Sequence, residues 1–172
     1  GQLPIEEQWV EGMTKVYVNA VTSWRAFLKR SLDVTVSLAT LTLGAPVFAA
    51  VACAIKLDSK GPVFYSQKRV GIKGSVFHMY KFRSMKSDAE VQSGPVWATE
   101  NDPRVTKVGK FLRKTHLDEL PQFINVLKGE MSIVGPRPER PFFVKELRRQ
   151  IPHYDRRHFA KPGITGLAQI KR

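Results

Sequence analysis

The feature that most constrains this chain is a run of 22 residues without a charged side chain, from Val34 to Ile55. A helix needs about 20 mostly apolar residues to cross a bilayer, so the run is long enough to span one. It begins too far from the N-terminus, and is too long, for a cleaved signal peptide. The run therefore predicts membrane contact in the mature protein.

A proline lies near the middle of this run, in Gly44-Ala45-Pro46. Pro46 removes a helical hydrogen bond and clashes with the preceding turn, so we expect a bend there. Basic residues flank both ends of the run, whereas a single crossing favours Lys and Arg on one side only. This pattern predicts a re-entrant helix-break-helix over about residues 31–57, with Asp33 and Lys56 at its mouths. The residues alone leave a kinked spanning helix equally open, and a buried core helix is a third interpretation.

Composition limits the remaining choices. The 172 residues carry 28 Lys and Arg against 15 Asp and Glu, a formal net charge of +13, which indicates one basic domain. Such a charge suits nucleic acid, an anionic membrane surface or a phosphorylated small molecule. The single cysteine, Cys53, excludes a disulfide scaffold and a cysteine-based zinc site.

Several local patterns predict the surrounding elements. Apolar residues spaced by three and four from Trp9 to Leu28 indicate an amphipathic helix, either on the membrane surface or on the protein's own core. Two short strands, 63–65 and 76–80, form a hairpin through Gly71–Gly74. Residues 86–108 predict a long loop that could act as a lid. Residues 142–157 indicate a helix on the membrane surface, and a solvated helix interrupted at Pro152 is the alternative.

Basic residues on the second strand are candidates for phosphate binding. Period-two alternation predicts that Lys81 and Arg83 share one strand face, where two cations could grip a diphosphate. From spacing alone, an ordinary solvated strand face is the favoured interpretation.

Two adjacent carboxylates, Asp118 and Glu119, precede an apolar stripe that ends at Gly129. Pro121 is tolerated only in a first helical turn, so the pattern predicts a helix that begins near Asp118. Acidic residues often cap a helix, and spacing alone favours that interpretation. Alternatively, the pair could hold a divalent cation and attack a phosphorus atom, close to Arg113.

Prolines flank Arg137 in Gly135-Pro136-Arg137-Pro138. They stiffen the backbone and present a guanidinium suited to a phosphate or a base edge.

Six motifs in order resemble those of the bacterial sugar transferases, the monotopic phosphoglycosyl transferases. The resemblance runs from about Lys29 to the C-terminus, and the motifs are Lys29-Arg30-Ser31-Leu32-Asp33 with the apolar run, Lys81-Phe82-Arg83-Ser84-Met85, Leu117–Gln122, Asn125–Ser132, Gly135–Pro138 and Lys161–Gly166. Residues 29–172 would then form the catalytic domain, and residues 1–28 a linker or the tail of an upstream domain. The implied fold is α+β and mostly helical, with a re-entrant anchor, interfacial helices and a small β-hairpin.

The resemblance also implies an activity. Members transfer a sugar-1-phosphate from a UDP-sugar to polyprenol (undecaprenyl) phosphate, with Mg²⁺, at the cytoplasmic face of the bacterial plasma membrane. This is the first membrane step of exopolysaccharide or O-antigen assembly. The resemblance implies that the partners include membrane lipids and do not include nucleic acid. It is also compatible with a homo-oligomer.

The family's motifs assign roles to individual residues. They imply Asp118 as the nucleophile, Glu119 as the magnesium ligand, Arg137 at the nucleotide, and Lys81, Arg83 and Arg113 near the phosphates. Two positions depart from the family pattern, because Ala45 replaces a serine before Pro46 and Leu167 replaces a tryptophan. A membrane-anchored nucleic-acid-binding module and a non-catalytic scaffold are the alternatives.

Overall fold

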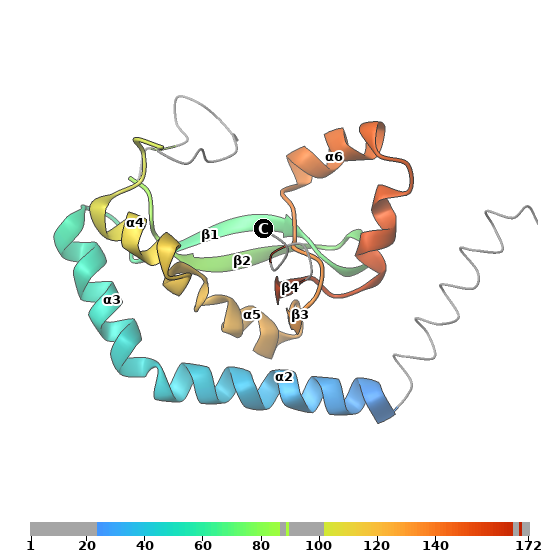
Figure 1. The fold of residues 1–172 in the computed structure, drawn as a ribbon, viewed down its shortest axis with the longest axis horizontal. Helices are drawn as coiled ribbons and strands as arrows, with labels where there is room; N and C mark the ends of the chain where they lie inside the picture. Colours follow the sequence, from blue (N-terminus) through green and yellow to red (C-terminus); the bar gives the residue numbers. More distant parts are fainter. Residues whose placement is uncertain (1–23, 87–88, 90–101, 167–168, 170–172) are drawn as a thin grey trace, which may run out of the picture.

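The computed structural model describes residues 24–86, 89, 102–166 and 169. The predicted amphipathic helix from Trp9 and most of the predicted loop 86–108 lie outside these residues. The described part is α+β, with five α-helices, three short 3-10 turns and two small sheets (Figure 1).

The uncharged run forms two helices that meet at a sharp bend. Helix α2 spans Trp24–Leu43 and helix α3 spans Ala45–Asp58, with Pro46 in the first turn of α3. The two axes are bent by 60° at Gly44, so the predicted break is confirmed. A Cβ atom at Gly44 would lie 2.3 Å from the carbonyl oxygen of Thr40, which leaves little room for another residue in this corner. No single described helix is long and apolar enough to cross a membrane, whereas α2 and α3 meet that criterion as a bent pair.

The exposed surface of α2 is largely apolar, while its buried residues are polar. Asp33 and Ser37 are buried, and large apolar side chains face outward, among them Trp24, Phe27, Leu32 and Leu43. A helix on the surface of a soluble protein has the opposite pattern, with polar side chains outward and apolar side chains buried. Helix α3 does contribute to the core, because Val51 and Ile55 pack with Phe82 and Leu112.

Asp33 fastens α2 to the rest of the fold. Its carboxylate accepts hydrogen bonds from the hydroxyl of Ser132 at 2.8 Å and from the backbone N–H of Ile133 at 3.1 Å. Lys29 also contacts Asp33, at 3.2 Å, and Ser132. Arg30 donates to the carbonyls of Val126 and Leu127, at 2.6 and 2.8 Å.

The predicted hairpin is confirmed and is longer than expected. Strands β1 (Phe64–Val70) and β2 (Val76–Phe82) pair antiparallel through the 3-10 turn η1 (Ile72–Gly74). Phe77 and Met79 of β2 pack against Val126 and Met131.

The prediction that a helix begins near Asp118 is wrong, because the helix begins at Gln122. Helix α4 (Lys107–Lys114), which the sequence patterns did not predict, precedes a separate 3-10 turn η2 (Leu117–Glu119), and helix α5 runs only from Gln122 to Lys128. The rigid ring of Pro121 separates turn from helix at the α5 N-cap. The predicted stop is confirmed, since Gly129 adopts φ 82° at the C-cap.

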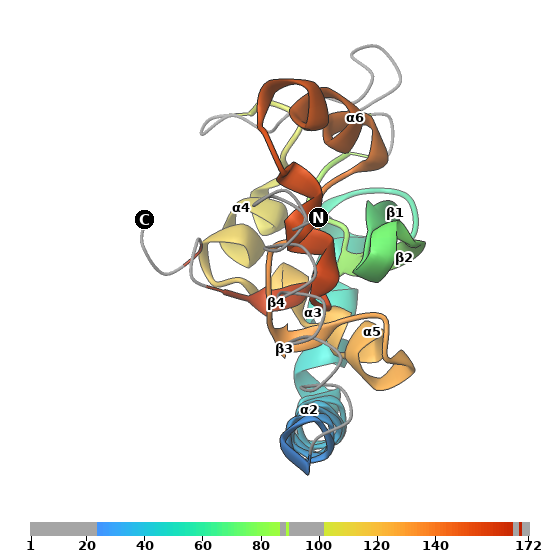
Figure 2. The ribbon, with the colours of Figure 1, turned by 90° about the vertical axis from the view of Figure 1, so that its right-hand side faces the viewer.

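The C-terminal part returns to the hairpin. Strand β3 (Ser132–Val134) pairs parallel with β4 (Gly163–Thr165), and between them lie helix α6 (Pro141–Gln150) and the turn η3 (Tyr154–Phe159). The helix interrupted near Pro152 is thus confirmed. Its placement on a membrane surface is not favoured, because Phe143, Val144 and Tyr154 are buried and because α6 lies at the opposite end of the molecule from α2 (Figures 1 and 2).

Candidate active site

Three segments that are distant in sequence bring their charged side chains together. The Nζ atom of Lys81, on β2, lies 2.6 Å from Oε1 of Glu119 and 3.9 Å from Oδ2 of Asp118, both on η2. Nη2 of Arg137, from the turn after β3, lies 3.0 Å from the same Glu119 oxygen. Four of the six residues implied at the site therefore form one cluster.

Asn125 fixes the position of this cluster. It is completely buried, its Oδ1 accepts the backbone N–H of Tyr80 at 3.0 Å, and its Nδ2 donates to the carbonyl of His78 at 2.7 Å. Nδ2 also lies 2.7 Å from Oε2 of Glu130. The side chain thereby joins α5 to the strand that carries Lys81. Asn125 lies in a motif of the sequence that predicts no role for it, because residue spacing does not distinguish a buried amide from an exposed one.

The pKa values of the two adjacent carboxylates are shifted in opposite directions. Burial raises the pKa of Asp118, and the negative charge of Glu119 adds to that rise. The positive charges of Lys81 and Arg113 act in the opposite direction but do not cancel it. Burial also acts to raise the pKa of Glu119, but the charges and hydrogen bonds of Lys81 and Arg137 outweigh it, so the net pKa is lowered. Glu119 is thus held as an anion by two cations, while Asp118 is the less stabilised carboxylate.

Arg113 and Arg83 stand outside the direct contacts of the cluster. Arg113 donates from Nε to the Ser84 hydroxyl at 2.9 Å, and its charge acts to lower the pKa of Asp118. Arg83 does not share a face with Lys81, contrary to the strand-alternation prediction. β2 ends at Phe82, and the buried Arg83 guanidinium turns to the end of α3, where it donates to the carbonyls of Ser59 and Lys60 at 2.7 and 2.8 Å.

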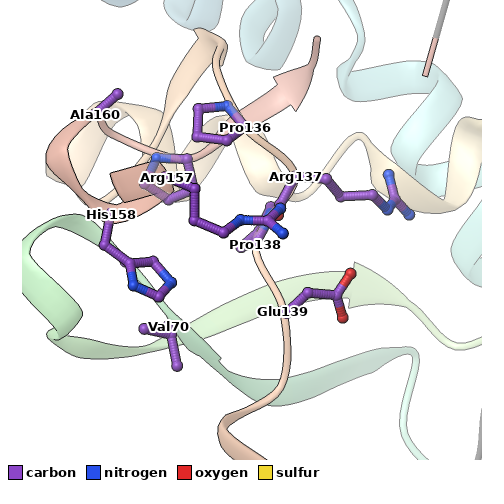
Figure 3. A pocket seen from close by; sticks show the side chains of 10 residues that line it. Val70, Pro136, Arg137, Pro138, Glu139, Arg157, His158 and Ala160 are labelled. Atoms are coloured by element: carbon purple, nitrogen blue, oxygen red, sulfur yellow. The ribbon is translucent and has the colours of Figure 1, made fainter. Parts of the chain in front are cut away.

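The turn that carries Arg137 borders a cavity of about 360 Å³. The cavity is lined by this turn together with Arg157 and residues that follow β4, including Gly166 and Gln169. Figure 3 shows a smaller pocket that shares Pro136, Arg137 and Arg157 with this cavity. In it, Arg157 points toward the turn, and the side chain of Arg137 leaves the turn in another direction. The cavity is within the size range of small-molecule sites.

The acidic pair could hold Mg²⁺ only with help from a ligand. The described residues contain no group of three or more His, Cys, Asp and Glu side chains placed to hold a metal. Mg²⁺ in phosphate-transferring sites is, however, commonly bound by one or two carboxylates plus substrate phosphates. The hard oxygens of Asp118 and Glu119 fit such a site.

Comparisons with known proteins agree on one family. Residues 24–172 match the family model described as bacterial sugar transferase. A UDP-N-acetylgalactosamine-undecaprenyl-phosphate N-acetylgalactosaminephosphotransferase of Aeromonas hydrophila is 50% identical over 145 residues, which cover 84% of this chain and 34% of the relative. A UDP-glucose:undecaprenyl-phosphate glucose-1-phosphate transferase of Escherichia coli (strain K12) is 48% identical over 166 residues, 96% of this chain and 36% of the relative. Galactosyl transferase CpsE of Streptococcus agalactiae is 46% identical over 152 residues, 83% of this chain and 33% of the relative. The chain thus spans about a third of the length of each of these relatives.

Proposed function

The chain belongs to the bacterial sugar transferase family, and we propose that it transfers a sugar-1-phosphate from a UDP-sugar to undecaprenyl phosphate. Relatives whose names contain both substrates support this activity. The observation that carries it is the buried Asp118 carboxylate, with Lys81 3.9 Å away and its neighbour Glu119 held by Lys81 and Arg137. A carboxylate can approach a negatively charged phosphate only where cations offset the repulsion.

The proposed reaction has two displacements at one phosphorus atom. In the first, an Asp118 oxygen attacks the phosphorus that bears the sugar, the bond to the bridging oxygen breaks, and UMP leaves with the electron pair. In the second, a phosphate oxygen of undecaprenyl phosphate attacks the sugar-phosphoryl-aspartate. The bond to Asp118 then breaks, which regenerates the carboxylate and yields an undecaprenyl diphosphate sugar.

The surrounding residues have distinct tasks in this scheme. Lys81 lies closest to both carboxylates and offsets the charge of the approaching diphosphate, with Arg113 as a second cation near Asp118. Arg137 extends from a proline-stiffened turn, and its guanidinium suits static recognition of the nucleotide. Arg83 supports the site indirectly, because it holds the chain at the end of α3.

Mg²⁺ is the cofactor that we propose for this site. Glu119 would hold it together with oxygens of the diphosphate, and the bound ion would neutralise part of the charge that develops on UMP.

We place the active site at the cytoplasmic face of the bacterial plasma membrane, with α2 and α3 as a re-entrant anchor. Three features support this placement: the outward-facing apolar side chains of α2, the 60° bend, and basic residues on both flanks. Exposed apolar surface of this kind is costly in water and favourable in the hydrocarbon layer, where the lipid acceptor resides. The alternative of a nucleic-acid-binding module is not favoured, because the family match covers nearly the whole chain.

A panel of UDP-sugars tests the proposed function. The membrane-embedded protein is incubated with undecaprenyl phosphate, Mg²⁺ and, in turn, UDP-glucose, UDP-galactose and UDP-N-acetylgalactosamine, the sugars suggested by the names of the relatives. We expect UMP and a lipid-linked sugar to form with at least one donor and not with the Asp118→Asn variant. Turnover that survives in Asp118→Asn would contradict the assignment of the nucleophile.

A further inference from the structure

Arg157 contacts the turn that carries Arg137 without contacting the acidic pair. Its Nη2 donates to the backbone carbonyl of Arg137 at 2.6 Å, and its Nη1 donates to the hydroxyl of Tyr154 at 2.8 Å. The guanidinium also lies over the ring of Tyr154, 4.9 Å from its centroid. The Arg157 side chain therefore links a buried tyrosine of η3 to the Pro-Arg-Pro turn. Figure 3 shows the Arg157 side chain pointing toward this turn.

Three consecutive carbonyls of this turn each have their own donor. The carbonyl of Pro136 accepts from the N–H of Gly163 at 3.0 Å, that of Arg137 from Arg157, and that of Pro138 from Arg69 at 3.0 Å. Among these three donors, Arg157 is the one that binds the carbonyl of Arg137, the residue whose side chain contacts Glu119. The donors come from β4, η3 and β1, so the turn is held from three separate elements.

The bond from Arg157 fixes a torsion that the prolines restrict but do not fix. Their rings fix φ at positions 136 and 138, but ψ of Arg137 is only restricted to a broad range by the following proline. The direction of the Arg137 carbonyl follows ψ, and a donor that fixes this carbonyl therefore fixes the torsion. A small error in ψ displaces the guanidinium relative to Glu119 and to any ligand that it binds.

We propose that Arg157 is a positioning residue, which aims the guanidinium of Arg137 at Glu119 and at the nucleotide by holding the Arg137 carbonyl. The inference rests on the proposed function and adds to it a residue outside the reacting groups. Lysine could keep the charge at this position, but it could not hold Tyr154 and the Arg137 carbonyl with one planar fork.

A double-mutant cycle tests this role. KM for the UDP-sugar and kcat are measured for Arg157→Gln, Arg137→Lys and the double variant, with Arg149→Gln as the matched control. Arg149 is an exposed arginine of α6, paired with Glu146. We expect Arg157→Gln to raise KM roughly tenfold to a hundredfold, the range for loss of one hydrogen bond from a charged group, with a smaller change in kcat. Arg157→Lys should recover only part of the loss, and Arg149→Gln should behave as the parent protein.

The cycle separates positioning from independent effects. If Arg157 acts through Arg137, the Arg157→Gln change should have much less effect in the Arg137→Lys background than in the parent. Equal effects in both backgrounds, or an unchanged KM in Arg157→Gln, would overturn the positioning role and leave the proposed function intact. Absence of turnover by the parent with every UDP-sugar would instead overturn the proposed function, and this inference with it. Melting temperatures of all variants show whether a loss reflects unfolding.

Discussion

The ammonium of Lys81 lies 2.6 Å from the carboxylate of Glu119, which makes Glu119 the better stabilised of two adjacent acids. Asp118 lies 3.9 Å from the same nitrogen and is buried, with its pKa raised by that burial. The pair thus combines an anion fixed by cations with a carboxylate that gains more from an additional positive charge. This asymmetry fits a division of labour between a charge-holding and a reacting group.

The asymmetry predicts opposite stability changes at the two positions. The folded-state pKa of Asp118 is raised, so its contribution is favourable below the unfolded pKa of about 3.9 and is lost as pH rises through the folded value. Asp118→Asn should therefore melt at a higher temperature than the parent at neutral pH. The folded-state pKa of Glu119 is lowered, so its stabilisation is present above about pH 4.3 and is lost as pH falls further. Glu119→Gln should cost roughly 1–3 kcal/mol at neutral pH.

Thermal unfolding of the membrane-embedded variants between pH 4 and pH 8 measures both changes. The Asp118→Asn difference should shrink toward pH 4, because the raised pKa allows Asp118 to become protonated as pH falls. The Glu119→Gln difference should largely persist over this range, because the lowered pKa of Glu119 confines its loss to lower pH. Glu146→Gln is the control, since Glu146 is an exposed acid paired with Arg149 on α6. A shift of the same sign in both variants at pH 7 would argue against the asymmetry.

Asn125 should be critical for stability although it lies outside the reacting groups. Asn125→Ala leaves the N–H of Tyr80 and the carbonyl of His78 without their side-chain partner and opens a cavity at a completely buried position. We expect a loss of about 2–4 kcal/mol in the free energy of unfolding, because lost hydrogen bonds and a cavity are each costly. Denaturant unfolding measures this loss. Gln150→Ala, which removes an exposed hydrogen bond to Glu146, should change stability by less than about 0.5 kcal/mol.

Local rules predicted the elements in which backbone chemistry dominates. Pro46 predicted the bend, Gly129 predicted the helix stop, and two short strands joined through Gly71–Gly74 predicted the hairpin. The rules failed where tertiary contacts decide. Spacing placed Arg83 beside Lys81, but the carbonyls at the end of α3 lie within its reach and draw the guanidinium away from the site. The meeting of Lys81, Glu119 and Arg137 depends on how three distant segments pack, which no local spacing encodes.

Arg137→Lys should affect substrate binding more than chemistry. The variant keeps the positive charge but loses the planar fork that suits a nucleotide. We expect KM for the UDP-sugar to rise roughly tenfold, with a smaller fall in kcat. Steady-state kinetics measures both constants, and Arg149→Lys is the control for a general effect of the substitution. An unchanged KM would count against a role of Arg137 at the nucleotide.

The re-entrant topology predicts that both flanks of the bent pair lie on the cytoplasmic side. After replacement of Cys53, cysteines placed at Glu11 and at Lys60 should both be protected from an impermeant thiol reagent in intact cells. Labelling of only one of them from outside would establish a spanning helix. Pro46→Leu restores the helical hydrogen bond and should shift the segment toward a spanning arrangement, so labelling at one flank should increase.

The proposed mechanism predicts a covalent intermediate on Asp118. Incubation with a UDP-sugar in the absence of undecaprenyl phosphate should release UMP in a burst of about one equivalent and add a sugar phosphate to the peptide that contains Asp118. Steady-state kinetics with both substrates should be ping-pong, because UMP leaves before the acceptor reacts.

Asp118→Asn and Glu119→Gln should each abolish the burst for different reasons, the first by removing the nucleophile and the second by removing the anion proposed to hold Mg²⁺. Raising the Mg²⁺ concentration should therefore restore part of the burst in Glu119→Gln and none in Asp118→Asn. Ternary-complex kinetics without an adduct would instead make Asp118 a metal ligand or a base and favour direct transfer.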